Sequence, residues 1–254
     1  MQSEIKEALS EYLLALGDDE LILGHRDAEW CGHAPLIEED IAFANLALDE
    51  IGHAAIWYTL LADLLGEDRE GYPDRLIFQR PVEGFRNAQL FELPRGDWAF
   101  SLVRQYLFDL FEMHNLSGLE KSTFTPLAEA AQKIRKEEIY HHRHTRAWVQ
   151  RLALGTSESW RRMKEAVDQA WPLTVQLFLH SPADRDLVYF GYIPSGEHLY
   201  TAWLEEATKF LQDCQLSVPA IAEESISRRV HTAHLKVLVD EMQSVARLEP
   251  EAAW

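Results

Sequence analysis

The stretches that decide the fold are Glu50-Ile51-Gly52-His53 and Glu138-Ile139-Tyr140-His141, two motifs of one type. Each lies inside a long segment with helical periodicity, and residues three apart on a helix share one face. Each motif therefore presents a carboxylate and an imidazole to the same point. Two such motifs, with a Glu from each of two other helices, form the ligand set of carboxylate-bridged di-iron and di-manganese bundles.

Hydrophobic periodicity predicts one all-α domain over residues 1–254, with a four-helix bundle core and additional C-terminal helices. Residues 67–96 read as a long connection between two helix pairs, and 180–196 as irregular. Pro172 should kink the helix that contains it or mark a change of register, and Thr125-Pro126 predicts a helix cap followed by proline at the first helical position. The expected helices cover residues 4–30, 36–65, 97–121, 125–154, 157–178, 197–214 and 220–246.

The first predicted hairpin supplies a partner for the first motif. In an antiparallel hairpin, residues equidistant from the turn lie at the same height. A turn near Ala34–Pro35 places Glu50 opposite positions 19–20, and Glu20 is there. Glu20 also falls on a stripe at helical spacing whose other members are Leu9, Leu13, Leu16 and Leu23.

The second predicted hairpin repeats this arrangement. A turn near Phe124 places Glu138 opposite positions 109–112. Asp109 and Glu112 both lie there, three apart on one face of the helix. We take Glu112 as the ligand and Asp109 as a residue that holds His141 or another ligand by hydrogen bonding, and the opposite assignment stays open.

The alternative is that these residues lie on solvated helix faces, since the 36–65 segment is rich in acidic residues. Buried carboxylates cost several kcal/mol each unless they are paired or bound to metal, and a pair of divalent cations is the usual remedy. Oxygen donors with one nitrogen per metal suit iron or manganese. The sequence thus favours a dinuclear iron or manganese site with the ligands Glu20, Glu50, His53, Glu112, Glu138 and His141.

Composition narrows the function classes further. The formal charge of −18 argues against binding to nucleic acid or to an anionic membrane surface. No apolar run approaches the roughly 18–20 residues that span a bilayer, and the polar start is unlike a signal peptide. Cys31 and Cys214 show no metal-type spacing, so we expect free thiols and a cytoplasmic location. There is no phosphate loop and no flavin or nicotinamide fingerprint, so no organic cofactor is expected and electrons for any redox chemistry must come from another polypeptide.

Several longer stretches resemble a known family. They are Glu29-Trp30-Cys31-Gly32-His33-Ala34-Pro35, the run from Asp40 to Asn45, and the run from Leu48 to Ala54. With shorter matches such as Arg104-Gln105-Tyr106 and His231-Thr232, they make nearly the whole chain similar to the C subunit of bacterial phenylacetyl-CoA epoxidase.

That resemblance implies a ferritin-like bundle in a multicomponent monooxygenase of aerobic phenylacetate breakdown. Such a complex inserts one oxygen atom from O2 into the ring of phenylacetyl-CoA and forms a 1,2-epoxide. The catalytic di-iron centre lies in a related A subunit, an iron–sulfur flavoprotein reductase supplies electrons, and the C subunit pairs with the A subunit. C subunits are usually regarded as structural because many members have lost metal ligands, whereas this chain retains the six residues named above.

Three interpretations follow from the sequence. The chain is an assembly subunit of the epoxidase that pairs with an A-type subunit, or a subunit that also activates O2 at its own dinuclear site. The third is a stand-alone ferritin-like di-iron or di-manganese oxidoreductase or metal-binding protein. In the absence of partners, the chain could form a homodimer. The sequence leaves the catalytic activity of the chain itself open.

Overall fold

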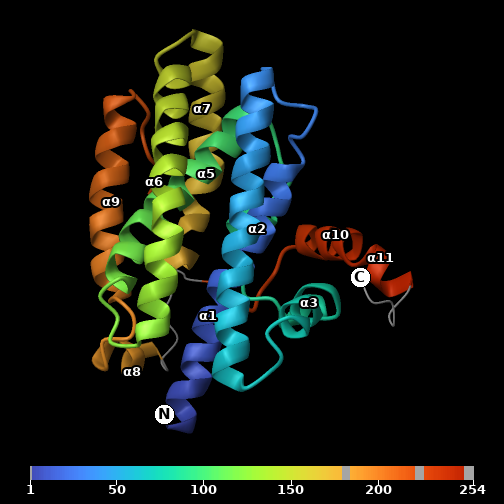
Figure 1. Ribbon diagram of the computed structural model, residues 1–254. Helices are drawn as coiled ribbons and strands as arrows, with labels where there is room; N and C mark the ends of the chain where they lie inside the picture. Colours follow the sequence, from blue (N-terminus) through green and yellow to red (C-terminus); the bar gives the residue numbers. More distant parts are fainter. Residues whose placement is uncertain (1, 179–183, 221–225, 249–254) are drawn as a thin grey trace.

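Two long helical hairpins form the centre of the fold (Figure 1). The computed structural model describes residues 2–178, 184–220 and 226–248. In the first hairpin α1 (Ser3–Ala28) packs along α2 (Ile37–Leu65), and in the second α5 (Trp98–Leu119) packs along α6 (Thr125–Ala153). The described residues contain helices and no strand. The predicted all-α fold, a ferritin-like bundle, is confirmed.

Shorter elements surround this bundle. Helices α7 and α9 pack against α5, and α8 packs against α1. Figure 1 shows α3, α10 and α11 grouped on the side of α2 away from α6. The elements outside the two hairpins are α3 (Gly71–Phe78), the 3₁₀ turn η1 (Val82–Gly84), α4 (Gln89–Glu92), α7 (Ser157–Ala170), the 3₁₀ helix η2 (Trp171–Phe178), α8 (Asp184–Tyr189), α9 (Gly196–Asp213), α10 (Ala233–Met242) and α11 (Ser244–Leu248).

Local sequence signals explain several helix boundaries. The Asp97 side chain accepts a hydrogen bond from the Phe100 amide and begins α5. Thr156 forms a capping box at the start of α7. The kink predicted at Pro172 is a change from α-helix to 3₁₀ helix at Trp171, because proline cannot donate to the α-helical ladder. The cap predicted at Thr125 is wrong by one residue, since the extended Phe124 precedes α6 and Pro126 lies in its first turn.

Two boundary predictions in the C-terminal third are also wrong. Residues 180–196 are expected from the sequence to be irregular, but α8 occupies Asp184–Tyr189. The part of this prediction that falls on 180–183 lies outside the described residues. The helix expected from 220 begins only at Ala233, and 221–225 is likewise not described. Residues 226–232 are extended or turned because their side chains bind distant parts of the chain, such as Arg228 to Asp19 and His231 to Glu92. Tertiary contacts override helical periodicity here.

The interior holds two hydrophobic clusters with polar residues at their junction. One cluster includes Phe111, Trp171 and Trp203, and the other includes Leu16 and Leu116. Along α1, α5 and α6, the predicted ligands fall between residues of the first cluster and residues of the second. Among the described helices, none has the length and apolar character needed to cross a membrane.

Candidate metal centre

The seven side chains predicted for the site all lie inside the bundle. Each is at most 1% exposed, and together they come from the four helices of the two hairpins. They are Glu20 on α1, Glu50 and His53 on α2, Asp109 and Glu112 on α5, and Glu138 and His141 on α6. The alternative placement on solvated faces is therefore wrong.

Gly24 lets α1 approach α2 closely beside the site. A Cβ atom at this position would lie 3.1 Å from the Cβ of Glu50 and 2.9 Å from the Cγ1 of Ile51. The 2.9 Å distance is shorter than real Cβ contacts and the 3.1 Å distance is tighter than most, so a larger residue here would displace Ile51 or Glu50. The close approach brings Glu20, one turn earlier on α1, toward the motif on α2.

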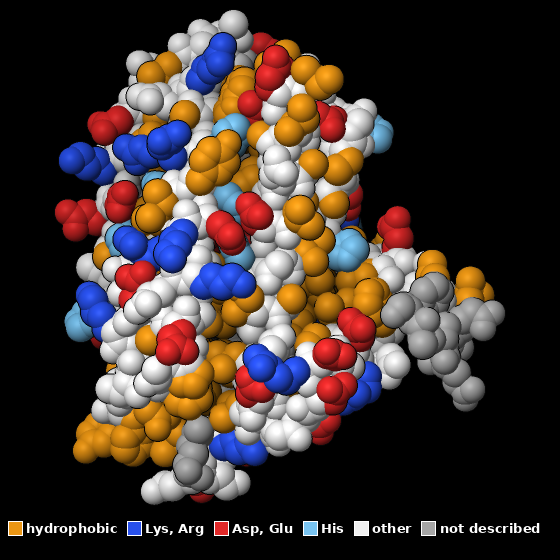
Figure 2. All heavy atoms as spheres, in the orientation of Figure 1, with side chains coloured by type: hydrophobic (Ala, Val, Ile, Leu, Met, Phe, Trp, Pro, Cys, Tyr) orange, Lys and Arg blue, Asp and Glu red, His pale blue; other side chains and the backbone are white. Residues whose placement is uncertain are grey.

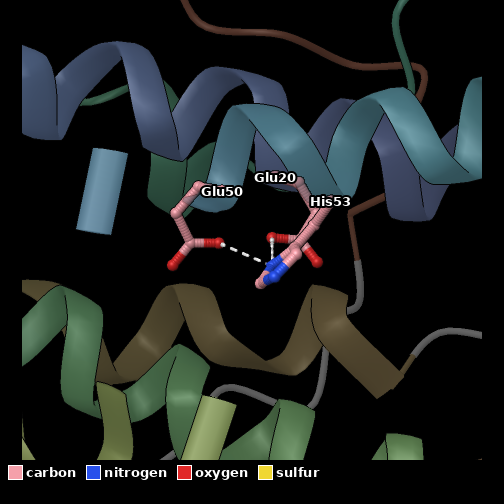
Figure 3. A group of neighbouring side chains, drawn as sticks. All are labelled: Glu20, Glu50 and His53. Atoms are coloured by element: carbon pink, nitrogen blue, oxygen red, sulfur yellow. Dashed lines mark ion pairs between the residues drawn. The ribbon is translucent and has the colours of Figure 1, made fainter. Parts of the chain in front are cut away.

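Two groups of side chains have the spacing of metal ligands. One consists of Glu20, Glu50 and His53, and the other of Glu50, Glu138 and His141. Within each group, one potential ligand atom per residue lies within 4.8 Å of the others. Figure 3 shows the first group, with the carboxylates of Glu20 and Glu50 turned toward the imidazole of His53. Glu50 belongs to both groups, which is the position of a bridging carboxylate.

The same ring nitrogen of both histidines faces the centre. His53 Nδ1 lies 3.7 Å from Glu20 Oε2 and 3.4 Å from Glu138 Oε1. His141 Nδ1 lies 2.8 Å from Glu138 Oε1 and 3.6 Å from Glu50 Oε1. The two ring centroids are 6.0 Å apart. The two imidazoles therefore flank one compact set of carboxylate oxygens.

Most of these inward atoms make no hydrogen bond. Both oxygens of Glu20 and of Glu138, Oε2 of Glu50, and Nδ1 of both histidines are buried and make no hydrogen bond of regular geometry to the described residues, although His141 Nδ1 and Glu138 Oε1 lie 2.8 Å apart. Buried polar atoms are satisfied almost everywhere in folded proteins, so a cluster of orphaned acceptors is unusual. Their chemistry, hard oxygens with one nitrogen on each side, fits a pair of divalent iron or manganese ions.

The outward nitrogens of the two histidines are held by carboxylates from the opposite helix. His53 Nε2 lies 2.7 Å from Glu137 Oε2, and His141 Nε2 lies 3.2 Å from Asp49 Oδ2. A carboxylate only accepts hydrogen bonds, so Nε2 carries a proton in both histidines, and Nδ1 offers a lone pair to the interior whenever the imidazole is neutral. Sequence reasoning missed both acids. The available signal was an acidic residue immediately before each Glu-x-x-His motif.

Asp109 is bound within the protein in a way that Glu112 is not. Asp109 accepts hydrogen bonds from Gln105 Nε2 at 2.8 Å and from the Thr145 hydroxyl, and Gln105 also donates to Glu50 Oε1 at 2.6 Å. Asp109 thus contacts Glu50 through Gln105 rather than holding His141. Glu112 Oε2 has no hydrogen-bond partner, although Glu112 lies in neither of the two groups. Its role as a ligand stays a prediction.

Burial and mutual repulsion distribute protons unevenly over the cluster. Burial and then the charge of Glu50 raise the pKa of Glu20, and burial and then Glu138 raise the pKa of Glu112. Burial would also raise the pKa of Glu50, but Glu20 and His141 outweigh it and lower that pKa. Burial alone would lower the pKa of His141, yet the adjacent Glu138 carboxylate raises it strongly. Protons therefore compete with cations for these atoms, and metal affinity should rise with pH.

Comparison with known proteins identifies the family. The family model for phenylacetic acid catabolic proteins matches residues 1–254. The chain belongs to the phenylacetic acid catabolic protein family. This member is 36% identical to the C subunit of 1,2-phenylacetyl-CoA epoxidase from Escherichia coli (strain K12) over 251 residues, which cover 97% of this chain and 99% of that relative. The resemblance inferred from the motifs is thereby confirmed.

A second relative links the chain to another type of epoxidase component. This chain is 27% identical over 153 residues to the A subunit of 1,2-phenylacetyl-CoA epoxidase from the same bacterium. These residues cover 60% of this chain and 48% of that relative. The family therefore contains homologous subunits of more than one kind.

Proposed function

We propose that this chain is a subunit of a phenylacetyl-CoA 1,2-epoxidase, a ring-oxygenating monooxygenase complex, and that it pairs with an A-type subunit. Support comes from the match to the C subunit over nearly all of both chains, and from the weaker match to the A subunit. Electrons would come from a separate iron–sulfur flavoprotein reductase, as the family resemblance implies.

We further propose that the chain carries its own dinuclear iron or manganese site. The observation that carries this proposal is the set of buried oxygens and Nδ1 atoms that converge without hydrogen bonds. Glu50, which belongs to both groups, would help to hold both ions, and His53 and His141 would each help to hold one. Three further carboxylates would complete the set, Glu20, Glu112 and Glu138.

Side chains around this site would orient the ligands. Glu137 and Asp49 fix the ring orientation and tautomer of the two imidazoles. Gln105 holds one oxygen of Glu50 and so orients the bridging carboxylate. The proposed ligands are each at most 1% exposed, and solvent approaches the site at the outer carboxylates, Glu137 and Asp49. Bound iron would supply the O2-reducing chemistry that a monooxygenase requires.

Metal content per chain tests the site. Protein from iron- or manganese-supplemented cells should hold about two ions per chain, the stoichiometry of carboxylate-bridged bundles. Glu50→Ala should lose both ions, because both groups share this residue. Glu129→Ala, an exposed acid on α6, is the matched control and should keep them. Well-folded wild-type chain without metal would overturn the proposed site.

His53→Ala separates an assembly role from catalysis. If the chain serves only assembly, the variant should bind the A-type subunit with wild-type affinity, and turnover by the complex should be unchanged. If its own site activates O2, assembly should survive and O2-dependent turnover should be lost. The stand-alone alternative predicts O2 reactivity of the metal-loaded chain without any partner.

A further inference from the structure

Helix α2 has a second apolar face, opposite the one that faces the metal centre. Its members are Ile37, Ile41, Ala44, Leu48, Ile51 and Ala55, hereafter the α2 seam. Ile37 is 74% exposed, Ile41 59% and Leu48 67%. Figure 2 shows hydrophobic side chains recurring along α2 on the face turned to the viewer, and in Figure 1 no described element lies in front of it.

The spacing within the α2 seam is that of a helix-pairing surface. Successive members are four, three, four, three and four residues apart, which is the alternation of a and d positions in a coiled coil. The seam extends for about 27 Å at 1.5 Å per residue. A helix apolar on two faces is normally buried on both, and contiguous exposed apolar surface of this kind marks interaction sites.

Toward the C-terminal half of α2 the seam opens into a groove. The groove has a volume of about 570 Å³ and lies between α2 and α6, with Ala55 and Ile56 on one wall and Pro126 and Ala130 on the other. Two acidic and two basic residues also line it: Asp63, Glu129, Arg69 and Lys133. Farther along α6, Tyr140 is 52% exposed and its ring stacks on His144, which is bound to Glu39 of α2. Apolar side chains therefore lie on both sides of the α2–α6 junction, interspersed with charged ones.

Charge indicates what kind of helix would cover this surface. Helix α2 contains six acidic residues, of which all but Glu39 and Glu50 are at least partly exposed, and no Lys or Arg. Pairing α2 with its own copy would set these acidic helices side by side, in a chain that already carries a formal charge of −18. A partner helix with an apolar seam and basic flanks is favoured over a second copy of this chain.

We propose that the α2 seam is the docking surface for a helix of the A-type subunit, an inference that rests on the proposed function. A homologous bundle supplies a helix of suitable length, and the similarity to the A subunit extends over 60% of this chain. Docking there would also cover Asp49 and Glu137, the half-exposed acids that hold the two site histidines. Assembly would thus close the solvent side of the metal centre.

The test measures affinity for the A-type subunit from the same organism, using full-length chains and isothermal titration calorimetry. Leu48→Gln should raise Kd roughly 30-fold or more, as expected for a central interface residue. Val237→Gln on α10 is the matched control, because Val237 is equally exposed at 67%. It should change Kd by less than roughly threefold, as surface residues outside an interface do. Ile41→Asp, at the other end of the seam, is the second variant and should also weaken binding.

The outcomes separate the surface from the proposed function. Both seam variants should keep the thermal unfolding midpoint and metal content of wild type, since both side chains are exposed in the isolated chain. If wild type and both seam variants bind the A-type partner equally well, the docking surface is wrong but the proposed function stands. If wild type does not bind it, both fail. Self-association of wild type that Leu48→Gln abolishes, seen by analytical ultracentrifugation, would replace the A-type partner with a second copy.

Discussion

Three consecutive acidic residues on α1 have the same burial but different partners. Asp18, Asp19 and Glu20 are each at most 1% exposed. Asp18 is paired with Arg80, whose Nη1 lies 3.2 Å away, and Asp19 is paired with Arg228 at 2.7 Å. Among the described residues Glu20 has no Lys or Arg partner and no hydrogen bond to either oxygen, and its one basic neighbour is His53, whose Nδ1 lies 3.7 Å away.

Helix geometry separates the three carboxylates. Successive side chains on an α-helix point about 100° apart, so adjacent residues reach different neighbours. Asp18 also accepts hydrogen bonds from the Tyr58 hydroxyl and the Arg86 amide, and it fastens the 80–86 segment to α1. Glu20 faces the bundle interior, where its neighbours are other carboxylates and His53. The contrast indicates that the protein neutralises two of these acids itself and leaves the third for a cation.

The largest expected effect comes from breaking the pair that the protein supplies. Asp18→Asn would leave the Arg80 guanidinium, 9% exposed, without its counter-charge. Removing one partner of a buried ion pair typically costs about 3–5 kcal/mol, and we expect a loss of this size in the free energy of unfolding. Urea unfolding followed by circular dichroism measures it.

An exposed ion pair provides the control for this variant. Asp63 and Arg69 lie 3.1 Å apart, and their side chains are 43% and 68% exposed. Asp63→Asn should cost less than about 1 kcal/mol, as exposed pairs do. Equal losses in Asp18→Asn and Asp63→Asn would show that the buried pair has no special weight.

The next effect depends on metal. In metal-free protein, Glu20→Gln should leave the free energy of unfolding unchanged or increase it, because the variant no longer has a buried carboxyl that must either take up a proton or carry a charge repelled by Glu50. With Mn(II) at 100 times Kd, wild type should gain about 2.7 kcal/mol per site and the variant should gain little. Thermal unfolding with and without Mn(II) makes the comparison. A metal-free loss as large as that of Asp18→Asn would mean that Glu20 has a partner within the protein.

Much of the bundle and its polar centre was predictable from periodicity. The four bundle helices lie where apolar spacing placed them, within about two residues at each end, and Glu20 entered the site because it interrupts a leucine stripe. Both signals are local: each needs one helix and its turn. The same reasoning could not predict that the α2 seam is exposed, because the sequence of a helix with two apolar faces resembles that of a helix buried on both sides.

The features that sequence could not supply depend on residues far apart in the chain. Arg80 and Arg228 are 62 and 209 residues from the aspartates that they pair with. Asp49 on α2 binds His141 on α6, and Glu137 on α6 binds His53 on α2. These contacts depend on how α2 faces α6, which the sequence of one helix does not determine. Likewise, the partners of Arg228 keep 226–232 out of a helix. Periodicity shows which face of a helix is buried but not what meets it there.

The smallest expected effect concerns Asp27, a buried acid intermediate between the paired Asp18 and the unpaired Glu20. Asp27, farther along α1, lies 3.7 Å from Arg104 Nη2, and neither of its oxygens accepts a hydrogen bond. Burial outweighs the attraction of Arg104 and raises the pKa of Asp27 to about 8. The folded state therefore binds this proton more tightly than the unfolded state, whose carboxyl has an ordinary pKa of about 3.9. The contribution of Asp27 to stability is present at pH 4 and is lost as the pH rises toward 8.

Replacing Asp27 with asparagine should remove this part of the pH dependence. In metal-free protein, the stability of wild type relative to Asp27→Asn should fall by at least about 1.4 kcal/mol between pH 4.5 and 8, the equivalent of one pKa unit. Urea unfolding of both proteins at several pH values in this window measures the difference. Parallel pH curves would mean that Arg104 neutralises Asp27 as fully as Arg80 neutralises Asp18. A wild-type curve that falls away from the variant's would place Asp27 nearer to Glu20, as a buried acid whose charge the protein does not balance by itself.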